Sequence, residues 1–539
     1  MKLLATYAFL SLVALGCSTS NASYCDETRS CASADEPYCD IEFNECTAAP
    51  ESTCDEINLC EDAESPICVD SQCVECENTS DCDVGFSCDS QNACVPFSCN
   101  PGEGENADCS QINPAIPFCA DDGASCRGCE EHNECASGIC ERDSSECVAA
   151  AEIIHVAKTG DLNPDCGEAD SPCLTVQSGL EQVSPTRAYL HIVGGSYDEQ
   201  LSLIKTEVTI VGSQGASIEP IVTENSTVLG IEGSSQVVVE GVDLRANPRS
   251  GVFATVAKCV GPNASLALID LTVGGATNIG VSASECAVTG QRLRVTGNSM
   301  GISIEDGPLH LEDSLVSVTT AASCVSGTRT AMTITGSTLS ECNTVGISLS
   351  DGALTLAASM IAGNRRGGVD LENSDFTLTN NFVVDNGELG TIGWGGLSIH
   401  NDEDHSPQVL EFNTIAGNRI AGSLSAAANL SCNTFAPTSG HSNIVYKTFT
   451  ESSQPNISLG NCNLQYSNIE GGASGTGNID ADPQFINAET ALGDYHLQQS
   501  SPSRNAAAPT ASGVDVDFDG DERSQGGRSD MGADEVLAP

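Results

Sequence analysis

Short runs of alternating apolar and polar residues dominate the chain from Ile153 onward, and segments rich in Gly, Asn, Asp and Ser separate them. Two runs match closely: Gly301–Leu311 and Gly346–Leu356 lie 45 residues apart, which is two repeats of about 22. Strands this short, with no helical pattern between them, must stack directly on one another. The pattern predicts an all-β fold, a single-stranded right-handed parallel β-helix, over residues 151–485. Similar glycine-led starts recur at Gly280, Gly368 and Gly396.

Asparagines fall near the ends of several predicted strands, at Asn298, Asn364, Asn386 and Asn418. Asn tolerates the left-handed backbone conformation of tight turns and can form a ladder with equivalent residues in neighbouring coils. We therefore expect a structural role for these four residues.

Six cysteines of this region form pairs about one coil apart. Because adjacent coils stack about 4.8 Å apart, a disulfide can join them. A short loop between two further cysteines suggests a fourth bond. The expected pairs are Cys259–Cys286, Cys324–Cys342, Cys432–Cys462 and Cys166–Cys173.

Residues 18–150 contain 20 cysteines that divide into five sets of four, between Cys25 and Cys147. Units of this size cannot bury a core, so we expect two local disulfides in each, with the modules stacked into a stalk. Three pairings are open for four cysteines, and we prefer first to third and second to fourth. The C-x-x-C pairs Cys73/Cys76 and Cys126/Cys129 would also suit zinc, but each spans a module junction and export disfavours thiolates.

Composition restricts the class of partner and the compartment. The 539 residues include 75 acidic and 20 basic side chains, for a formal net charge of −55, which repels nucleic acid. The 29 cysteines suit an exported, disulfide-bonded protein better than a cytosolic one. Residues 18–150 carry 30 of the acidic residues and only three arginines. We expect a monomer that has an acidic stalk and no nucleic-acid partner.

The first 17 residues have the layout of a secretory signal, in which a lysine precedes an apolar run too short to span a bilayer. The run ends in ALGC, which resembles the bacterial lipoprotein processing box, with Cys17 as the lipid-bearing residue. An ordinary signal peptide is the alternative. Removing Cys17 from the 29 cysteines leaves 28, which can pair completely. The resemblance and the following Ser18 imply a lipid anchor in the bacterial outer membrane, facing either the periplasm or the outside.

Further motifs resemble known families. The four-cysteine sets look like repeats of lipoproteins from Gram-negative predatory and soil bacteria, which have no known chemistry. The motifs VAKTGD, SPCLTVQ and GGSYDE at 156–199 resemble the first coil of pectin-lyase-like β-helix proteins, where a helix over 176–183 would cover the open end. The motifs NIDADPQF, DYHL, DGDER and DMGADE at 478–535 are similar to the choice-of-anchor Q signature, which implies a C-terminal cap over 486–539 in a surface or secreted protein.

The densest polar segment follows the only tryptophan, Trp394, and combines two histidines with three carboxylates. Such a set could bind a divalent ion, or supply general acid and base beside an aromatic platform for a sugar. A polar loop inserted between coils is the alternative. The members of this segment are His400, Asp402, Glu403, Asp404 and His405.

Two other motifs offer chemistry. Polysaccharide lyases of the β-helix fold use arginine or lysine as a base beside acidic calcium ligands, and Arg365 and Arg366 could serve in this way or simply offset surface charge. Asp515, Asp517 and Asp519 match the start of a calcium loop, but Gly526 replaces the glutamate of its twelfth position, which favours a structural turn.

Three functions remain open from the sequence. The first is an outer-membrane lipoprotein that displays a non-catalytic β-helix for adhesion or contact with glycans or matrix. The second is a calcium-dependent polysaccharide lyase or another carbohydrate-active enzyme, and the third is a structural spacer. Only the second involves a cofactor, calcium. A flat face laddered with Asn, Thr and Ser would favour display, whereas acidic side chains from successive coils around one cleft, near an arginine, would favour the lyase.

Overall fold

The computed structural model divides into two compact units, Met1–Val148 and Ala149–Pro539. The structure describes residues 38–40, 45–47, 67–69, 72–77, 81–82, 86–88, 91–96, 98–99, 109, 116–387, 394–420, 429–446, 457–458, 460–488, 493–509, 513–524 and 527–537. Cys17, expected to carry lipid, lies outside these residues.

The described residues of the first unit form five antiparallel hairpins, one for each set of four cysteines. In every hairpin the third cysteine of the set lies directly opposite the fourth, as Cys88 does Cys94. The hairpins are β1 (Tyr38–Asp40) with β2 (Glu45–Thr47), β3 (Ile67–Val69) with β4 (Gln72–Val74), β5 (Phe86–Cys88) with β6 (Cys94–Pro96), β7 (Phe118–Cys119) with β8 (Cys126–Arg127), and β9 (Cys140–Glu141) with β10 (Glu146–Cys147). Two 3₁₀ turns, His132–Glu134 and Ala150–Glu152, flank the last hairpin.

Disulfides close the last three modules in the first-to-third and second-to-fourth pattern. The paired Cα atoms lie 5.5 to 5.8 Å apart. The pairings expected for the first two modules involve cysteines outside the described residues. The observed bonds are Cys76–Cys88, Cys82–Cys94, Cys99–Cys119, Cys109–Cys126, Cys129–Cys140 and Cys135–Cys147.

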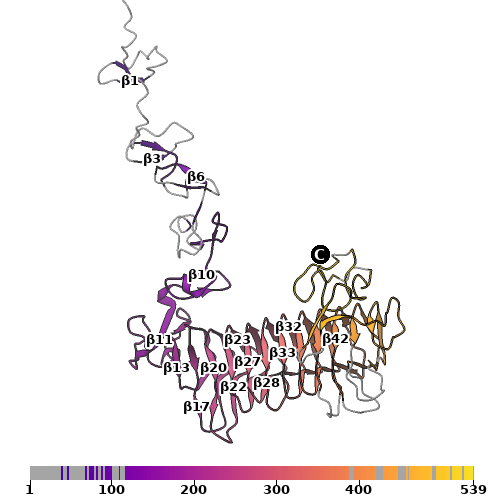
Figure 1. The fold of residues 1–539 in the computed structure, drawn as a ribbon. Helices are drawn as coiled ribbons and strands as arrows, with labels where there is room; N and C mark the ends of the chain where they lie inside the picture. The colour runs from indigo at the N-terminus through magenta and orange to yellow at the C-terminus, as the bar shows by residue number, and fades with distance from the viewer. Residues whose placement is uncertain are drawn as a thin grey trace, which may run out of the picture. The chain divides into compact units, whose positions relative to one another are not determined.

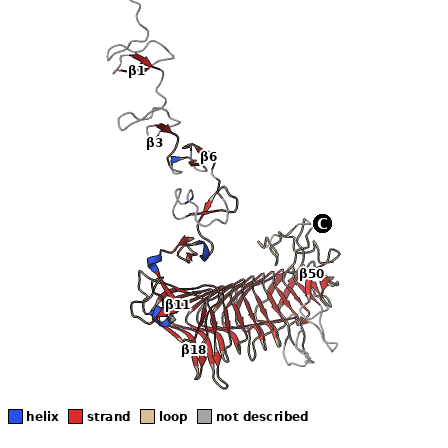
Figure 2. Cartoon of the chain, turned by 60° about the vertical axis from the view of Figure 1, so that its left-hand side comes forward, coloured by secondary structure: helices blue, strands red, loops and turns tan. Residues whose placement is uncertain are grey.

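The second unit is a right-handed parallel β-helix, as predicted, and its coils stack in one direction (Figures 1 and 2). The coils build three parallel sheets, numbered here 1 to 3. Each complete coil gives one strand to each sheet, in the order sheet 3, sheet 1, sheet 2. Sheet 1 consists of β11 (Ile153–Asp161), β12 (Tyr189–Ile192), β15 (Glu207–Gly212), β19 (Gln236–Glu240), β23 (Ser265–Ile269), β26 (Ala287–Gln291), β29 (Leu309–Glu312), β32 (Ala331–Thr335), β35 (Ala353–Ala357), β38 (Asp375–Thr379), β41 (Gln408–Glu411), β44 (Thr438–His441) and β47 (Cys462–Gln465).

The other two sheets have twelve and eleven strands. Sheet 2 consists of β13 (Gly195–Tyr197), β16 (Ala216–Ile218), β20 (Asp243–Arg245), β24 (Thr272–Gly274), β27 (Arg294–Thr296), β30 (Leu315–Ser317), β33 (Thr338–Ser340), β36 (Met360–Ala362), β39 (Phe382–Val384), β42 (Thr414–Ala416), β45 (Ile444–Tyr446) and β48 (Asn468–Ile469). Sheet 3 consists of β14 (Leu201–Ile204), β18 (Ser226–Glu232), β22 (Ala254–Val260), β25 (Ile279–Ser284), β28 (Met300–Glu305), β31 (Val325–Thr328), β34 (Val345–Ser350), β37 (Gly367–Glu372), β40 (Leu397–Asn401), β43 (Leu430–Thr434) and β46 (Ile457–Ser458).

A short helix and two pairs of short strands are the other described elements of this unit. Helix α2 (Val176–Leu180) is shorter than the stretch predicted over 176–183, and it packs on β11 and β12. The short strands β17 (Ile221–Val222) and β21 (Asn247–Pro248) pair beside the coils, and β49 (Phe485–Asn487) pairs with β50 (Asp494–Leu497).

Alternation along the strands explains the core. Leu309 and Leu311 of β29 point inward and are at most 1% exposed, whereas His310 between them points outward. The same alternation in successive coils stacks Leu, Ile and Val into one continuous apolar core. All four expected cysteine pairs of this unit are present, with Cα separations of 4.9 to 5.9 Å.

Two ladders of buried polar side chains run along the coils at the turns. Asn364 donates its backbone N–H to Asn386 Oδ1, and Asn386 donates in the same way to Asn418, both at 3.0 Å. The ladder expected for these residues is confirmed. The left-handed conformation expected for them is wrong, because it belongs to the preceding residue of each turn, such as Gly363 and Asp385.

The second ladder follows the turns between sheet 1 and sheet 2 and was not predicted from the sequence. Asn381, Asn413 and Asn443 occupy successive turns, and each donates its backbone N–H to the side chain in the next coil at 2.9 to 3.1 Å. Serines take the equivalent places in earlier coils: Ser314, Ser337 and Ser359. Because these polar groups are buried, each bond also removes a desolvation penalty.

The C-terminal segment after residue 485 packs on the outer face of sheet 2. Phe382, Val384 and Ala416 of that face pack with Tyr495 and Ala533. The segment expected to cap the β-helix therefore covers its flank as well as the last coil, where Asn468 Nδ2 donates to Ser503 Oγ at 2.9 Å. Figure 1 draws this segment in yellow beside β42.

Arg523 anchors the C-terminal segment to the coils. Its guanidinium is 4.1 Å from the Phe412 ring centroid and donates to Asn380 Oδ1 and to the carbonyl oxygens of Gly532 and Ala533. Burial lowers the pKa of Arg523 to about 10, although nearby carboxylates oppose that shift. The DGDER motif thus supplies a buried structural cation.

Replacing Asn413 by Ala should lower the stability of the β-helix by roughly 2–4 kcal/mol, because the side-chain hydrogen bonds to Asn381, to Asn443 and to two carbonyl oxygens are lost in a buried turn. Differential scanning calorimetry measures the effect. Asn463→Ala, at an exposed outward position of β47, should leave the transition almost unchanged. Equal shifts for the two variants would contradict a stabilising role of the ladder.

Candidate functional site

A cleft of about 700 Å³ lies at the turns that join sheet 3 to sheet 1. Four successive coils contribute to it, from the turn after β31 to the turn after β40. We call it the acidic cleft. Its polar lining includes Arg329, Asp351, Asn373, Asp375, Asp402, Glu403 and His405.

Regular turn geometry positions these side chains. Arg329, Asp351 and Asn373 are separated by 22 residues each and all have positive φ, between 45° and 55°. They are therefore equivalent corners of stacked coils. Asn373 Oδ1 accepts the backbone N–H of Asp402 at 2.9 Å, which ties the next turn to the same array. The 22-residue spacing of these polar residues is the signal in the sequence that could have predicted the cleft.

Arg329 is held by acidic partners at one end of the cleft. It donates to both carboxylate oxygens of Asp306 at 2.8 Å and to Glu305 at 2.5 Å. The hydrogen bonds that Arg329 donates to Asp306, and next the one to Glu305, raise the pKa of Arg329 above its ordinary value. A guanidinium held in this way is suited to binding and is poorly suited to accepting a proton as a base.

The polar segment around residue 400 divides between two environments. Asp402, Glu403 and His405 line the acidic cleft, and His405 Nδ1 lies 3.2 Å from Asp375 Oδ1. His400 instead contacts Asn433 Nδ2 at 2.8 Å, while its Nε2 is 3.3 Å from Asp402. Neither His400 nor the exposed Asp404 is among the residues that line the cleft.

Arg365, Arg366 and Trp394 lie at the opposite edge of sheet 3, where the chain enters from sheet 2. Both arginines are exposed, and Arg365 donates to Asn343 Oδ1 at 3.3 Å. The indole ring of Trp394 packs over Gly367. Because the strands β37 and β40 separate this edge from the acidic cleft, the structure does not bring these residues together with the carboxylates of that cleft.

The Asp515–Gly520 loop uses its central aspartate for structure. Asp517 is 1% exposed and accepts backbone N–H groups from Asp519, Asp521 and Glu535 at 2.8 to 2.9 Å. Asp515 and Asp519 are exposed. Of the three aspartates that match the start of a calcium loop, one is therefore buried and two are exposed, which agrees with the structural turn favoured from the sequence.

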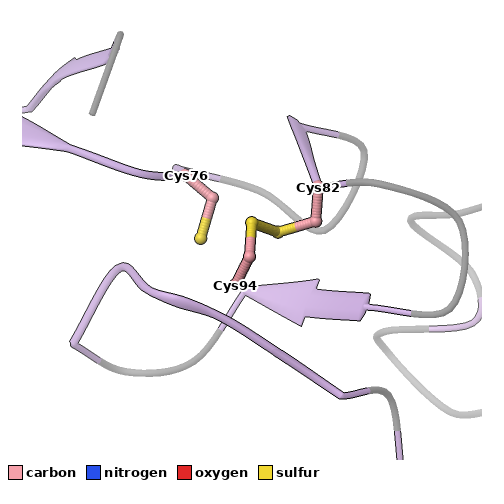
Figure 3. Close-up of side chains that lie close together, drawn as sticks. All are labelled: Cys76, Cys82 and Cys94. Atoms are coloured by element: carbon pink, nitrogen blue, oxygen red, sulfur yellow. A yellow bond between two sulfur atoms is a disulfide. The ribbon is translucent and has the colours of Figure 1, made fainter. Parts of the chain in front are cut away.

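The cysteines with zinc-like spacing are oxidised. Some sulfur atoms do lie close enough together to hold a metal ion, as those of Cys76, Cys82 and Cys94 do (Figure 3). Cys82 and Cys94 are bonded to each other, however, and Cys76 is bonded to Cys88. Disulfide sulfurs offer no thiolate to a metal, so the described part of the stalk favours the disulfide interpretation over zinc.

The outer face of sheet 3 carries a column of small polar side chains in register. Asp370 interrupts a run of partly exposed serines. Burial raises the pKa of Asp370 above its ordinary value, although a hydrogen bond from Ser398 opposes this shift. This face of sheet 3 adjoins the acidic cleft along the same coils. The column consists of Ser282, Ser303, Ser326, Ser348, Asp370, Ser398 and Ser431.

Comparison with known proteins supports the fold. A family model described as a right handed beta helix region matches residues 279–436. No curated protein matches the chain. Among the described residues, no helix is long and apolar enough to cross a membrane.

Solved structures with related coils include several carbohydrate-associated proteins. Pectate lyase Pel9A is 14% identical, with 71% of this chain and 96% of that chain covered and a TM-score of 0.45. XylC, in a complex with xylose, is 8% identical, with 71% and 98% covered and a TM-score of 0.46. A rhamnogalacturonan lyase is 13% identical, with 62% and 90% covered and a TM-score of 0.35.

Gly367→Ala should change the environment of Trp394, because a Cβ atom there would lie 2.4 Å from the indole ring. Trp394 is the only tryptophan, so its emission spectrum reports the change directly. We expect a shifted emission maximum and greater quenching by acrylamide. Gly230→Ala in β18, where the nearest atom would lie 3.7 Å away, is the matched control. Identical spectra for the two variants would disprove the contact.

Proposed function

We propose that the protein is a lipid-anchored surface protein that binds a polysaccharide along the acidic cleft without cleaving it. The observation that carries the proposal is that four successive coils place hydrogen-bonding side chains around one cleft. Adjacent coils repeat about every 4.8 Å, so equivalent groups recur along its length. A polymer with regularly repeated hydroxyl groups can use such an array.

The charge of the cleft selects the kind of polysaccharide. Asp351, Asp375, Asp402 and Glu403 present acceptors, whereas Arg329 is engaged by Glu305 and Asp306. Carboxylates accept hydrogen bonds from sugar hydroxyls but repel the carboxylates of uronic acids. We therefore propose a neutral, hydroxyl-rich glycan as the ligand. The serine column on sheet 3 extends the polar surface along the same coils.

The acidic cleft meets the first condition for a polysaccharide lyase, because carboxylates from successive coils surround it near Arg329, but two observations oppose that alternative. Its predicted combination of acidic residues with Arg365 or Arg366 would require groups at opposite edges of sheet 3 to act together. The arginine that does lie in the cleft, Arg329, has a raised pKa, which opposes its use as a base. Calcium remains a candidate cofactor only for that alternative.

Binding should weaken at least tenfold when three carboxylates of the cleft are neutralised in the variant Asp351→Asn/Asp375→Asn/Glu403→Gln, because hydrogen bonds to charged acceptors are lost. Isothermal titration calorimetry with a panel of neutral and acidic polysaccharides measures the affinity. Circular dichroism checks that the variant is folded. Glu341→Gln, an exposed position after β33, is the control for a charge change outside the cleft.

The same panel, incubated with protein and calcium, tests the lyase alternative through the ultraviolet absorbance of unsaturated products. Binding without product supports the proposal. Product formation, or the absence of binding to every polysaccharide, would overturn it.

Replacing Cys17 by Ala should abolish membrane attachment, because the residue proposed to carry the lipid is lost. Expression in a Gram-negative host with labelled fatty acid, followed by separation of inner and outer membranes, measures both lipid and location. Ser18→Ala should retain the lipid. A Cys17→Ala protein that still carries fatty acid and sediments with the outer membrane would contradict the anchor.

A further inference from the structure

We propose that the C-terminal segment contains a binding site for a divalent transition-metal ion, Zn²⁺ by its ligand chemistry, formed by His496, Asp519 and Asp534. One ligand atom of each residue lies within 4.8 Å of the other two. The residues come from three separate stretches, which are β50, the loop after Asp517 and the chain before Val536. The site is distinct from the acidic cleft and independent of the proposed glycan binding.

The separation of the ligand atoms suits zinc. His496 Nε2 lies 3.1 Å from Asp519 Oδ2. In tetrahedral zinc sites, bonds of about 2.0–2.2 Å place neighbouring ligand atoms about 3.3 Å apart. An imidazole with two carboxylates is a typical zinc donor set, whereas calcium prefers a shell made of oxygen atoms. A fourth position is open to water, because Asp519 is 47% exposed.

The histidine is oriented for coordination through Nε2. Its Nδ1 lies 2.6 Å from Asp494 Oδ1, which favours the proton on Nδ1 and leaves the lone pair on Nε2. Nε2 is buried and has no hydrogen-bond partner among the described residues, since its approach to Asp519 lacks hydrogen-bond geometry. A carboxylate that holds the second nitrogen of a histidine is a common outer shell of zinc sites.

The surroundings keep the other groups in place. The imidazole ring lies 5.1 Å from the Phe382 ring and 6.3 Å from the Phe518 ring, measured between centroids. Asp534 is 8% exposed, and its Oδ2 accepts the backbone N–H of Leu497 at 2.6 Å. These contacts fix two ligands from different stretches of chain before any ion arrives. A bound ion would also offset the charge of the buried Asp534 carboxylate.

A bound ion would link three stretches of the C-terminal segment to one another. Because His496 packs against Phe382, it would also hold the segment on the outer face of sheet 2. The intact protein, with its disulfides oxidised and freed of metal by EDTA, should bind one Zn²⁺ per chain in isothermal titration calorimetry. Co²⁺ in the same site should give visible absorption bands of a four-coordinate ion. Calorimetric scans should show a higher unfolding temperature with Zn²⁺ than without it.

His496→Gln and Asp519→Asn should each weaken Zn²⁺ binding at least tenfold and remove the Co²⁺ bands. Asp519 is exposed, so the second variant tests the site without disturbing a buried group. Asp515→Asn, in the same loop but outside the ligand set, should bind as the unaltered protein does. Unchanged Zn²⁺ affinity in both ligand variants, no stoichiometric binding, or a preference for Ca²⁺ over Zn²⁺ would overturn the proposal.

Discussion

The stacking of one coil on the next at a fixed register is the constraint on which the rest of the second unit depends. Each coil offers its turn amides to the side chains of the next coil, as Asn381, Asn413 and Asn443 show. A shift of one residue in any coil would break these bonds and turn its apolar residues toward solvent. Regular register therefore produces three things at once: a continuous core, buried polar ladders, and equivalent corner residues that line up on the surface.

That last consequence explains how a chain with a formal charge of −55 can form an organised surface. Corner residues 22 positions apart converge, so Asp351 lies between Arg329 and Asn373 in the acidic cleft. Two arginines lie beside acidic groups: Arg329 donates to Asp306 at 2.8 Å, and Arg523 Nη1 lies 3.7 Å from Glu535 Oε2. The arginines thus offset local negative charge, and the cleft keeps free acceptors for a ligand.

Periodicity made most of the fold predictable, because alternation and the 22-residue spacing depend only on local sequence. A separation of about one coil led to three of the four cysteine pairs of this unit, and a short loop led to the fourth. The candidate site was harder to predict, because Asp402, Glu403 and His405 could be recognised as a polar loop but their partners Asp351 and Asp375 lie one or two coils away. The conformation of the turn asparagines was misjudged for a related reason. Their side-chain oxygens accept N–H groups from the preceding coil, and the residue before them takes the left-handed position.

The hairpin geometry of the first unit has a consequence for how such a chain can change. In each of the last three modules, the opposed cysteines bond to the first and second cysteines of the same module. None of these six bonds crosses a module boundary. Each module is therefore a closed covalent unit, and duplication or deletion of one would leave every remaining cysteine with its own partner. The length of this part of the chain can vary in whole modules without any repair elsewhere in the protein.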